Sequence, residues 1–108
     1  MEFWDINSLE IEPHQPQVLR SDEEARAIAI LLPAGEELQE HQVHERSYLI
    51  VVDGEAEITA DGTSERGGPG VVVHLEPGER HTVRAASDTR LVLLLSPWPG
   101  VGHPSRHE

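Results

Sequence analysis

Short apolar runs alternate along the chain with clusters of turn-forming residues. β-prone runs occupy residues 25–32, 47–52, 71–75 and 91–95, and glycine, proline or aspartate bounds most of them. The breaks recur roughly every 8 to 12 residues, a spacing typical of a sandwich or barrel rather than a parallel α/β sheet. The pattern therefore predicts an all-β fold.

Two Asp-Gly pairs, at residues 53–54 and 61–62, enclose an alternating stretch over residues 55–60. Asp-Gly between β-prone runs is the strongest short-range hairpin signal, because the favoured two-residue turn needs positive φ at both positions. We therefore expect a hairpin at each pair and interpret both aspartates as turn residues. The one helical signal, residues 21–24, predicts no more than a capped turn.

The two ends of the chain differ from this middle part. Residues 1–24 carry two prolines among polar residues, and we expect an arm that packs on a barrel formed by residues 25–96. Residues 97–108 are rich in proline and glycine. We expect them to form a tail whose last residues are mobile and whose start is anchored by Trp98.

Length and charge narrow the functional class. The 108 residues suffice for one domain, and 20 acidic against 8 basic residues give a net charge of -12. That charge argues against nucleic acid and anionic membrane surfaces as partners. The sequence has no apolar run of about 18 residues and no signal-peptide pattern. We therefore expect a cytoplasmic protein without a membrane span.

Composition also excludes several chemistries. The chain has no cysteine, and all 8 basic residues are arginine. Disulfides, thiolate nucleophiles, cysteine-type zinc sites and lysine Schiff bases are thereby excluded. No catalytic residue stands out from the remaining side chains.

Histidine is the residue type that points to chemistry. His41 and His44 follow the turn at Gly35, and His81 follows the turn at Gly78. Closure of a barrel would gather these imidazoles at one mouth. Because imidazole binds Zn, Ni, Fe, Mn and Cu, we expect a divalent transition metal as the cofactor.

These positions resemble the two conserved motifs of the cupin family. The stretch from Gly35 through His41 to Gly54 resembles the first motif, and the stretch from Gly70 to His81 resembles the second. The resemblance implies a small double-stranded β-helix, or jelly-roll barrel. It also implies that the two motif histidines face each other in the barrel interior.

The first motif departs from the family pattern at two ligand positions. Val43 stands where a second histidine is expected, and Ser47 stands where a glutamate is expected. His44 is the natural substitute, although its strand parity points away from His41 unless a bulge or the strand end turns it back. The predicted metal ligands are therefore His41, His44 and His81.

Other charged residues near these histidines carry weaker signals. Glu40 and Glu45 are nearby carboxylates within reach of such a metal site, but a glutamate in a turn is usually solvated. Arg80 and Arg84 flank His81 and predict either an anion contact or ordinary surface charge.

The four other histidines lie outside the predicted site, and one apolar strand predicts a subunit contact. His74 has the parity of the outer face, and His14, His103 and His107 fall in the terminal segments, where we expect exposure. Residues 48–52, which begin with Tyr48, are apolar on both faces. A bare apolar face is an aggregation hazard, so we expect a second subunit to cover it in a homodimer.

Two functions stay open at this point. One is a metal-binding cupin that acts on a small organic molecule, with the oxygenase- or isomerase-like chemistry that the resemblance implies. The other is a non-catalytic binding or sensing module, because Val43 and Ser47 replace two usual ligands and interior candidates such as Leu49 are apolar. Both predict a small-molecule ligand.

Overall fold

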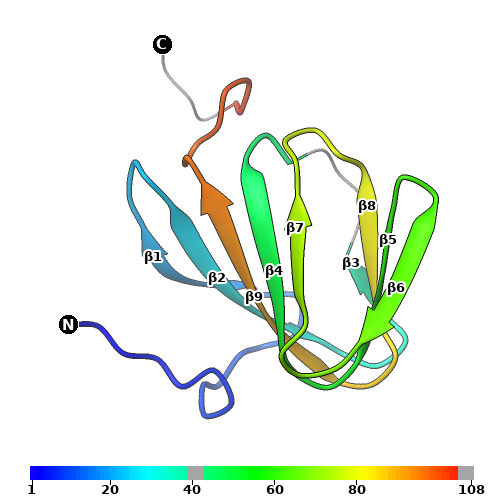
Figure 1. Cartoon of the computed structure of the whole chain (residues 1–108). Helices are drawn as coiled ribbons and strands as arrows, with labels where there is room; N and C mark the ends of the chain where they lie inside the picture. The colour runs from blue at the N-terminus through cyan, green and yellow to red at the C-terminus, as the bar shows by residue number, and fades with distance from the viewer. Residues whose placement is uncertain (39–42, 105–108) are drawn as a thin grey trace.

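A computed structural model describes residues 1–38 and 43–104, and every regular element in these residues is a β-strand (Figure 1). The strands are β1 (Gln17–Ser21), β2 (Arg26–Leu32), β3 (Glu37–Leu38), β4 (Arg46–Asp53), β5 (Ala56–Ala60), β6 (Thr63–Gly67), β7 (Val72–Leu75), β8 (His81–Ala85) and β9 (Thr89–Ser96). The predicted all-β class is confirmed. Within the described residues, no helix has the length and apolar character needed to cross a membrane.

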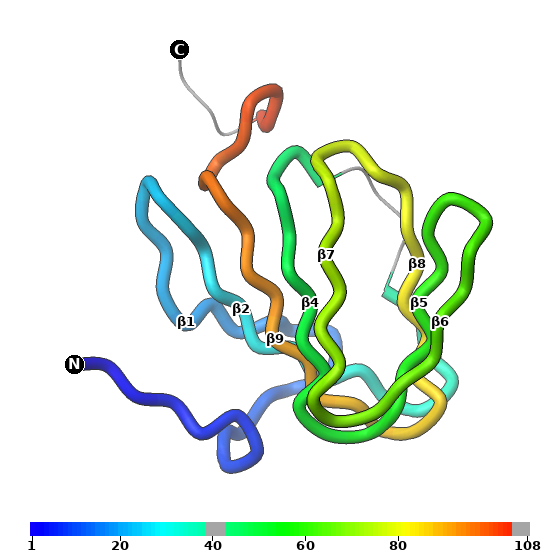
Figure 2. The backbone as a smooth tube through the Cα atoms, in the orientation of Figure 1, coloured from blue at the N-terminus to red at the C-terminus, as the bar shows by residue number. Residues whose placement is uncertain are grey.

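The strands form two antiparallel sheets that face each other (Figure 2). The larger sheet has the order β1-β2-β9-β4-β7, and the smaller one has the order β3-β8-β5-β6. The last long strand, β9, pairs with β2 on one side and β4 on the other, so segments far apart in sequence lie side by side. This crossing connectivity is that of a jelly-roll barrel.

The core lies between the sheets. Alternate residues of β4 point inward, and their register places Leu49 opposite Leu93 and Val51 opposite Leu91. Because successive side chains of a strand point to opposite faces, one set builds the core and the other faces outward. The buried core comprises Ile30, Leu32, Leu49, Val51, Ala56, Ile58, Val83, Ala85 and Leu91.

The two Asp-Gly pairs behave differently. Asp61 and Gly62 form the predicted hairpin between β5 and β6, with φ angles of 51° and 76°. The hairpin expected at Asp53 and Gly54 is wrong, because this pair connects β4 of the larger sheet to β5 of the smaller one. The constraint there is tight packing, since a Cβ on Gly54 would lie 2.3 Å from the carbonyl oxygen of Asp88.

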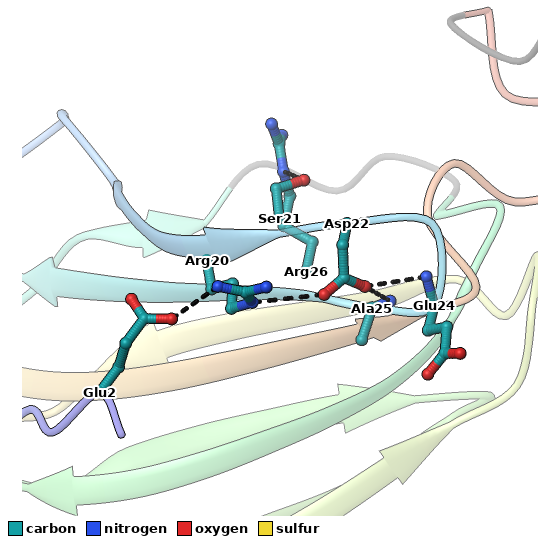
Figure 3. A network of polar contacts seen from close by, with 7 residues as sticks. All are labelled: Glu2, Arg20, Ser21, Asp22, Glu24, Ala25 and Arg26. Carbon is teal, nitrogen blue, oxygen red and sulfur yellow. Dashed lines mark hydrogen bonds and ion pairs between the residues drawn. The ribbon is translucent and has the colours of Figure 1, made fainter.

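The capped turn predicted at residues 21–24 joins β1 to β2 (Figure 3). One carboxylate oxygen of Asp22 accepts hydrogen bonds from the backbone N–H groups of Glu24 and Ala25, at 2.9 and 3.1 Å. These two donors hold the pKa of Asp22 below its ordinary value, with a smaller contribution from Arg20. Beside the turn, the Arg20 guanidinium donates to Glu2 at 2.6 Å.

The segment before β1 crosses the outer face of the larger sheet. The Arg90 guanidinium on β9 donates to the carbonyl oxygens of Ile6 and Leu9, at 2.7 and 2.8 Å. Ile11 is buried. This segment therefore contacts β9 of the larger sheet, and His14 within it also reaches Glu36 in the turn before β3. The predicted division of the chain into arm, barrel and tail stays a prediction.

Candidate functional site

A cavity of about 430 Å³ lies between the two sheets and opens at one end of the barrel. Three segments surround its mouth: the residues before β4, the loop after β7 and the segment after β9. They lie at the top of Figure 1. Its described lining comprises Pro16, Ile28, Ile30, Leu38, Val43, His44, Glu45, Leu49, Leu75, His81, Val83, Leu93, Leu95, Trp98, His103 and Pro104.

Inward-facing aliphatic residues make up most of the wall. Ile28, Leu49 and Leu93 lie on three neighbouring strands, and their pairing registers put them on the same face of the larger sheet. Val83 of β8 contributes from the smaller sheet. The inner wall therefore offers apolar contacts, and the polar side chains gather at the mouth.

Two of the predicted ligands, His44 and His81, line this cavity. His44 lies just before β4 begins at Arg46, so the parity of a regular strand does not hold its side chain outside. His81 is the first residue of β8, and its Nδ1 lies 3.2 Å from the carbonyl oxygen of Glu79. If Nδ1 carries the proton in that contact, Nε2 is the nitrogen free to accept.

Glu45 lines the cavity and is buried. Its place in a turn favoured a solvated carboxylate, but only 2% of its surface is exposed. Its Oε2 accepts a hydrogen bond from the backbone N–H of Gly100 at 2.6 Å. Strand alternation could have indicated this burial, because Glu45 lies two and four positions before the inward-facing Ser47 and Leu49.

The segment after β9 returns across the mouth of the cavity. His103 was expected to be exposed; instead it is half-buried and lines the cavity. Its ring centroid lies 4.7 Å from that of Trp98 and 5.7 Å from that of His44. The guanidinium carbon of Arg26 lies 4.2 Å from the centre of the Trp98 ring. Trp98 therefore anchors the segment, as expected.

Comparison with known proteins identifies the family. A family model described as Cupin domain matches residues 29–97, which is more than half of the chain. The chain belongs to the cupin family. No curated protein matches it.

Several solved structures have the same fold. An RmlC-like cupin from Desulfovibrio desulfuricans is 20% identical, with a TM-score of 0.78 over 90% of this chain and 96% of that one. An RmlC-like cupin from Shewanella frigidimarina is 24% identical, with a TM-score of 0.76 over 90% and 91% of the two chains. A conserved protein of unknown function from Streptococcus pyogenes is 21% identical, with a TM-score of 0.74 over 88% and 86%.

The structure describes two of the three predicted metal ligands, His44 and His81. The residues 1–38 and 43–104 contain no group of three or more His, Asp or Glu side chains placed to hold a metal ion. His44 and His81 share the cavity, whereas His41 and Glu40 lie outside the described residues. Ser47 is buried, and its hydroxyl has no hydrogen-bond partner in the described part of the chain. The predicted set of three metal ligands is therefore described at two of its positions only.

The remaining candidates lie away from the cavity. Arg80 and Arg84 are exposed and contribute nothing to its described lining. On the outer face, as expected, the ring of Tyr48 lies 5.0 Å from that of His74. His14 is exposed, as predicted, and lies 3.3 Å from a carboxylate oxygen of Glu36. His107 lies outside the described residues.

Proposed function

We propose that this cupin binds a small, mainly apolar molecule in the barrel cavity, with His44 and His81 contacting a polar group at one end of the ligand. The observation that supports this is a cavity of about 430 Å³ that has aliphatic walls and imidazoles at its mouth. Ligand pockets typically have such volumes, roughly 300–1,000 Å³, and few polar groups.

Charge narrows the class of ligand. Among the described lining residues, none is arginine or lysine, and the chain as a whole carries a net charge of -12. An anionic group would meet no permanent positive charge in this lining and would approach an acidic protein. A neutral ligand with one hydrogen-bonding end fits these features best.

The test is a fluorescence titration with the neutral probe N-phenyl-1-naphthylamine. We expect saturable binding to the wild type and loss of most of it in Leu93→Phe, because the added ring would fill the cavity that Leu93 lines. Leu94→Phe is the matched control, since the next residue of β9 lies outside the cavity lining. Equal binding by both variants would contradict the proposal.

A metal-dependent function is the second candidate, and the shared cavity of His44 and His81 favours it. In this candidate His41, His44 and His81 hold a divalent Zn, Ni, Fe, Mn or Cu ion. Such an ion supplies Lewis-acid or dioxygen chemistry of the oxygenase or isomerase kind on a small organic substrate. The residues of the chain would position that substrate against the apolar wall.

Elemental mass spectrometry of protein purified without chelator separates the two candidates. Near-stoichiometric metal in the wild type that is lost in His81→Ala would support the metal site. Less than about a tenth of an equivalent, without stabilisation by added metal, would leave the apolar cavity as the functional feature.

We also propose a homodimer through the outer face of the larger sheet. Tyr48 and Val72 on this face are 43% and 59% exposed. Adjacent exposed apolar residues on a sheet usually mark a contact surface. Light scattering at micromolar concentration should give twice the monomer mass, and Tyr48→Asp should shift the protein to monomer; a monomeric wild type would contradict the dimer.

A further inference from the structure

We propose that Glu45 is a positioning residue that holds the C-terminal segment, residues 97–104, against the cavity mouth, so that Trp98 and His103 complete the ligand-binding wall. The inference rests on the proposed function, since it assigns the residues that close the same site. The family model matches residues 29–97, so nearly all of this segment lies outside the matched region.

The contact between Glu45 and Gly100 is the fixed point of this arrangement. The Glu45 carboxylate is almost fully buried and accepts the Gly100 N–H at 2.6 Å. Hydrogen bonds to a carboxylate are stronger than neutral ones, and a buried carboxylate without such donors would be strongly unfavourable. The segment therefore supplies a hydrogen bond that the buried side chain requires.

Glycine at position 100 is required by the close approach. A Cβ there would lie 2.4 Å from the carbonyl oxygen of His44 and 2.9 Å from Oε2 of Glu45. Both neighbours belong to the stretch that precedes β4, so the backbone of the segment packs directly against it. Any larger residue would push the segment away from the mouth.

Aromatic contacts and one hydroxyl fix the rest of the segment. The His103 ring makes edge-on contacts with the rings of Trp98 and His44. At the start of the segment, the Ser96 hydroxyl donates to the carbonyl oxygen of Glu24 at 2.9 Å. The segment is thus attached on both sides of the mouth, and both of its rings line the cavity.

The first readout is the solvent access of Trp98, measured by acrylamide quenching in a Trp4→Phe background. In Glu45→Leu the Gly100 N–H loses its acceptor, and we expect the quenching constant to rise severalfold. Glu45→Gln keeps an acceptor oxygen and should restore the wild-type value. Quenching that is unchanged in Glu45→Leu, in a protein with a native circular dichroism spectrum, would overturn the positioning role.

The second readout is access to the cavity itself. Because the chain has no cysteine, Leu75→Cys introduces a single thiol at a cavity-lining position that is nearly fully buried. We expect Glu45→Leu to raise its labelling rate by a thiol reagent roughly tenfold, the factor for one lost hydrogen bond to a charged group. Thr63→Cys, at an exposed position on β6 outside the cavity lining, is the control and should not change.

Outcomes of these two readouts separate the inference from the proposed function. Neither readout needs a ligand, so failure of the probe to bind the wild type would contradict the proposed function alone. A released Trp98 with an unchanged Leu75→Cys labelling rate would overturn the role of the segment as a wall. Should Glu45→Leu fail to fold, Gly100→Ala displaces the segment sterically and is expected to change both readouts in the same direction.

Discussion

Two hydroxyls buried near opposite ends of the barrel, those of Thr89 and Ser47, differ in their hydrogen bonding. At the closed end, the fully buried Thr89 hydroxyl reaches the carbonyl oxygens of Ser87 and Glu55, at 2.7 and 3.0 Å. At the open end, the Ser47 hydroxyl is 1% exposed and has no partner among the described residues. Glu36 Oε2 at the closed end also lacks a hydrogen-bond partner in the described part of the chain, but it lies 3.3 Å from Nε2 of His14. The open end combines the unpaired Ser47 hydroxyl with a cavity.

This difference indicates which end is built for stability and which for binding. Hydrogen bonds from Ala34 to Asp88 and from Glu55 to Ser87, at 2.9 and 3.0 Å, tie the closed-end turns together. Proteins commonly place incompletely satisfied groups at functional sites and accept the loss of stability there. Substitutions at the closed end should therefore change stability, and those at the open end should change binding.

Gly54→Ala should have the largest effect. The new Cβ would lie 2.3 Å from the Asp88 carbonyl oxygen, at a residue whose φ is +84°. We expect a loss of about 3 kcal/mol in the free energy of unfolding, measured by urea denaturation. Gly62→Ala is the matched control, since its φ is +76° but its Cβ would meet nothing within 4 Å. Equal losses would show that backbone strain alone, and not closed-end packing, is responsible.

Thr89→Val should have the next largest effect. The substitution leaves the Glu55 and Ser87 carbonyl oxygens without the hydroxyl that donates to them at the buried closed end. We expect a loss of about 1–2 kcal/mol in unfolding free energy and no change in probe affinity. A weaker affinity for N-phenyl-1-naphthylamine would contradict the separation of the two ends.

The turn at Asp22 predicts a smaller, pH-dependent effect. The pKa of this carboxyl is held below its ordinary value of 3.8 by the N–H groups of Glu24 and Ala25. A lowered pKa in the folded state adds stability above the ordinary value, and that stability is lost as the pH falls through the folded-state pKa. The stability difference between wild type and Asp22→Ala should therefore shrink on acidification below pH 3.8. A difference that persists in acid would contradict it.

Ser47→Ala should have the smallest effect on stability. Since the hydroxyl has no partner in the described part of the chain, removing it sacrifices no hydrogen bond that the structure describes. We expect a change within about 0.5 kcal/mol, in contrast to Thr89→Val. A loss as large as that of Thr89→Val would show that Ser47 is satisfied after all and would weaken the contrast.

Much of the fold was predictable because strand signals are local. The apolar runs at residues 25–32 and 91–95 became β2 and β9, and the Asp61-Gly62 turn formed its hairpin. The polar β6 was predicted only as the second strand of that hairpin, since its own residues are largely exposed and it is held by pairing with β5. The sheet change at Gly54 was missed because Asp-Gly permits the turn, while packing against Asp88 decides the direction that the next strand takes.

Less of the site was predictable because it depends on contacts between distant segments. His44 and His81 were expected at one mouth, and both line the cavity. The burial of Glu45 and His103 was missed, since in each case it depends on the return of the segment after β9. Strand parity gave a weak signal for Glu45, whereas the composition of the tail predicted mobility for its end.

Binding in the cavity is tested most directly by titrating isotope-labelled wild-type protein with N-phenyl-1-naphthylamine and following two-dimensional amide NMR spectra. We expect the shifted resonances to belong to cavity-lining residues such as Leu75, His81 and Val83, while those of Thr89 and Ala56 stay unchanged. Shifts confined to the closed end or the outer face of the larger sheet would contradict the cavity as the binding site, as would the absence of any saturable change.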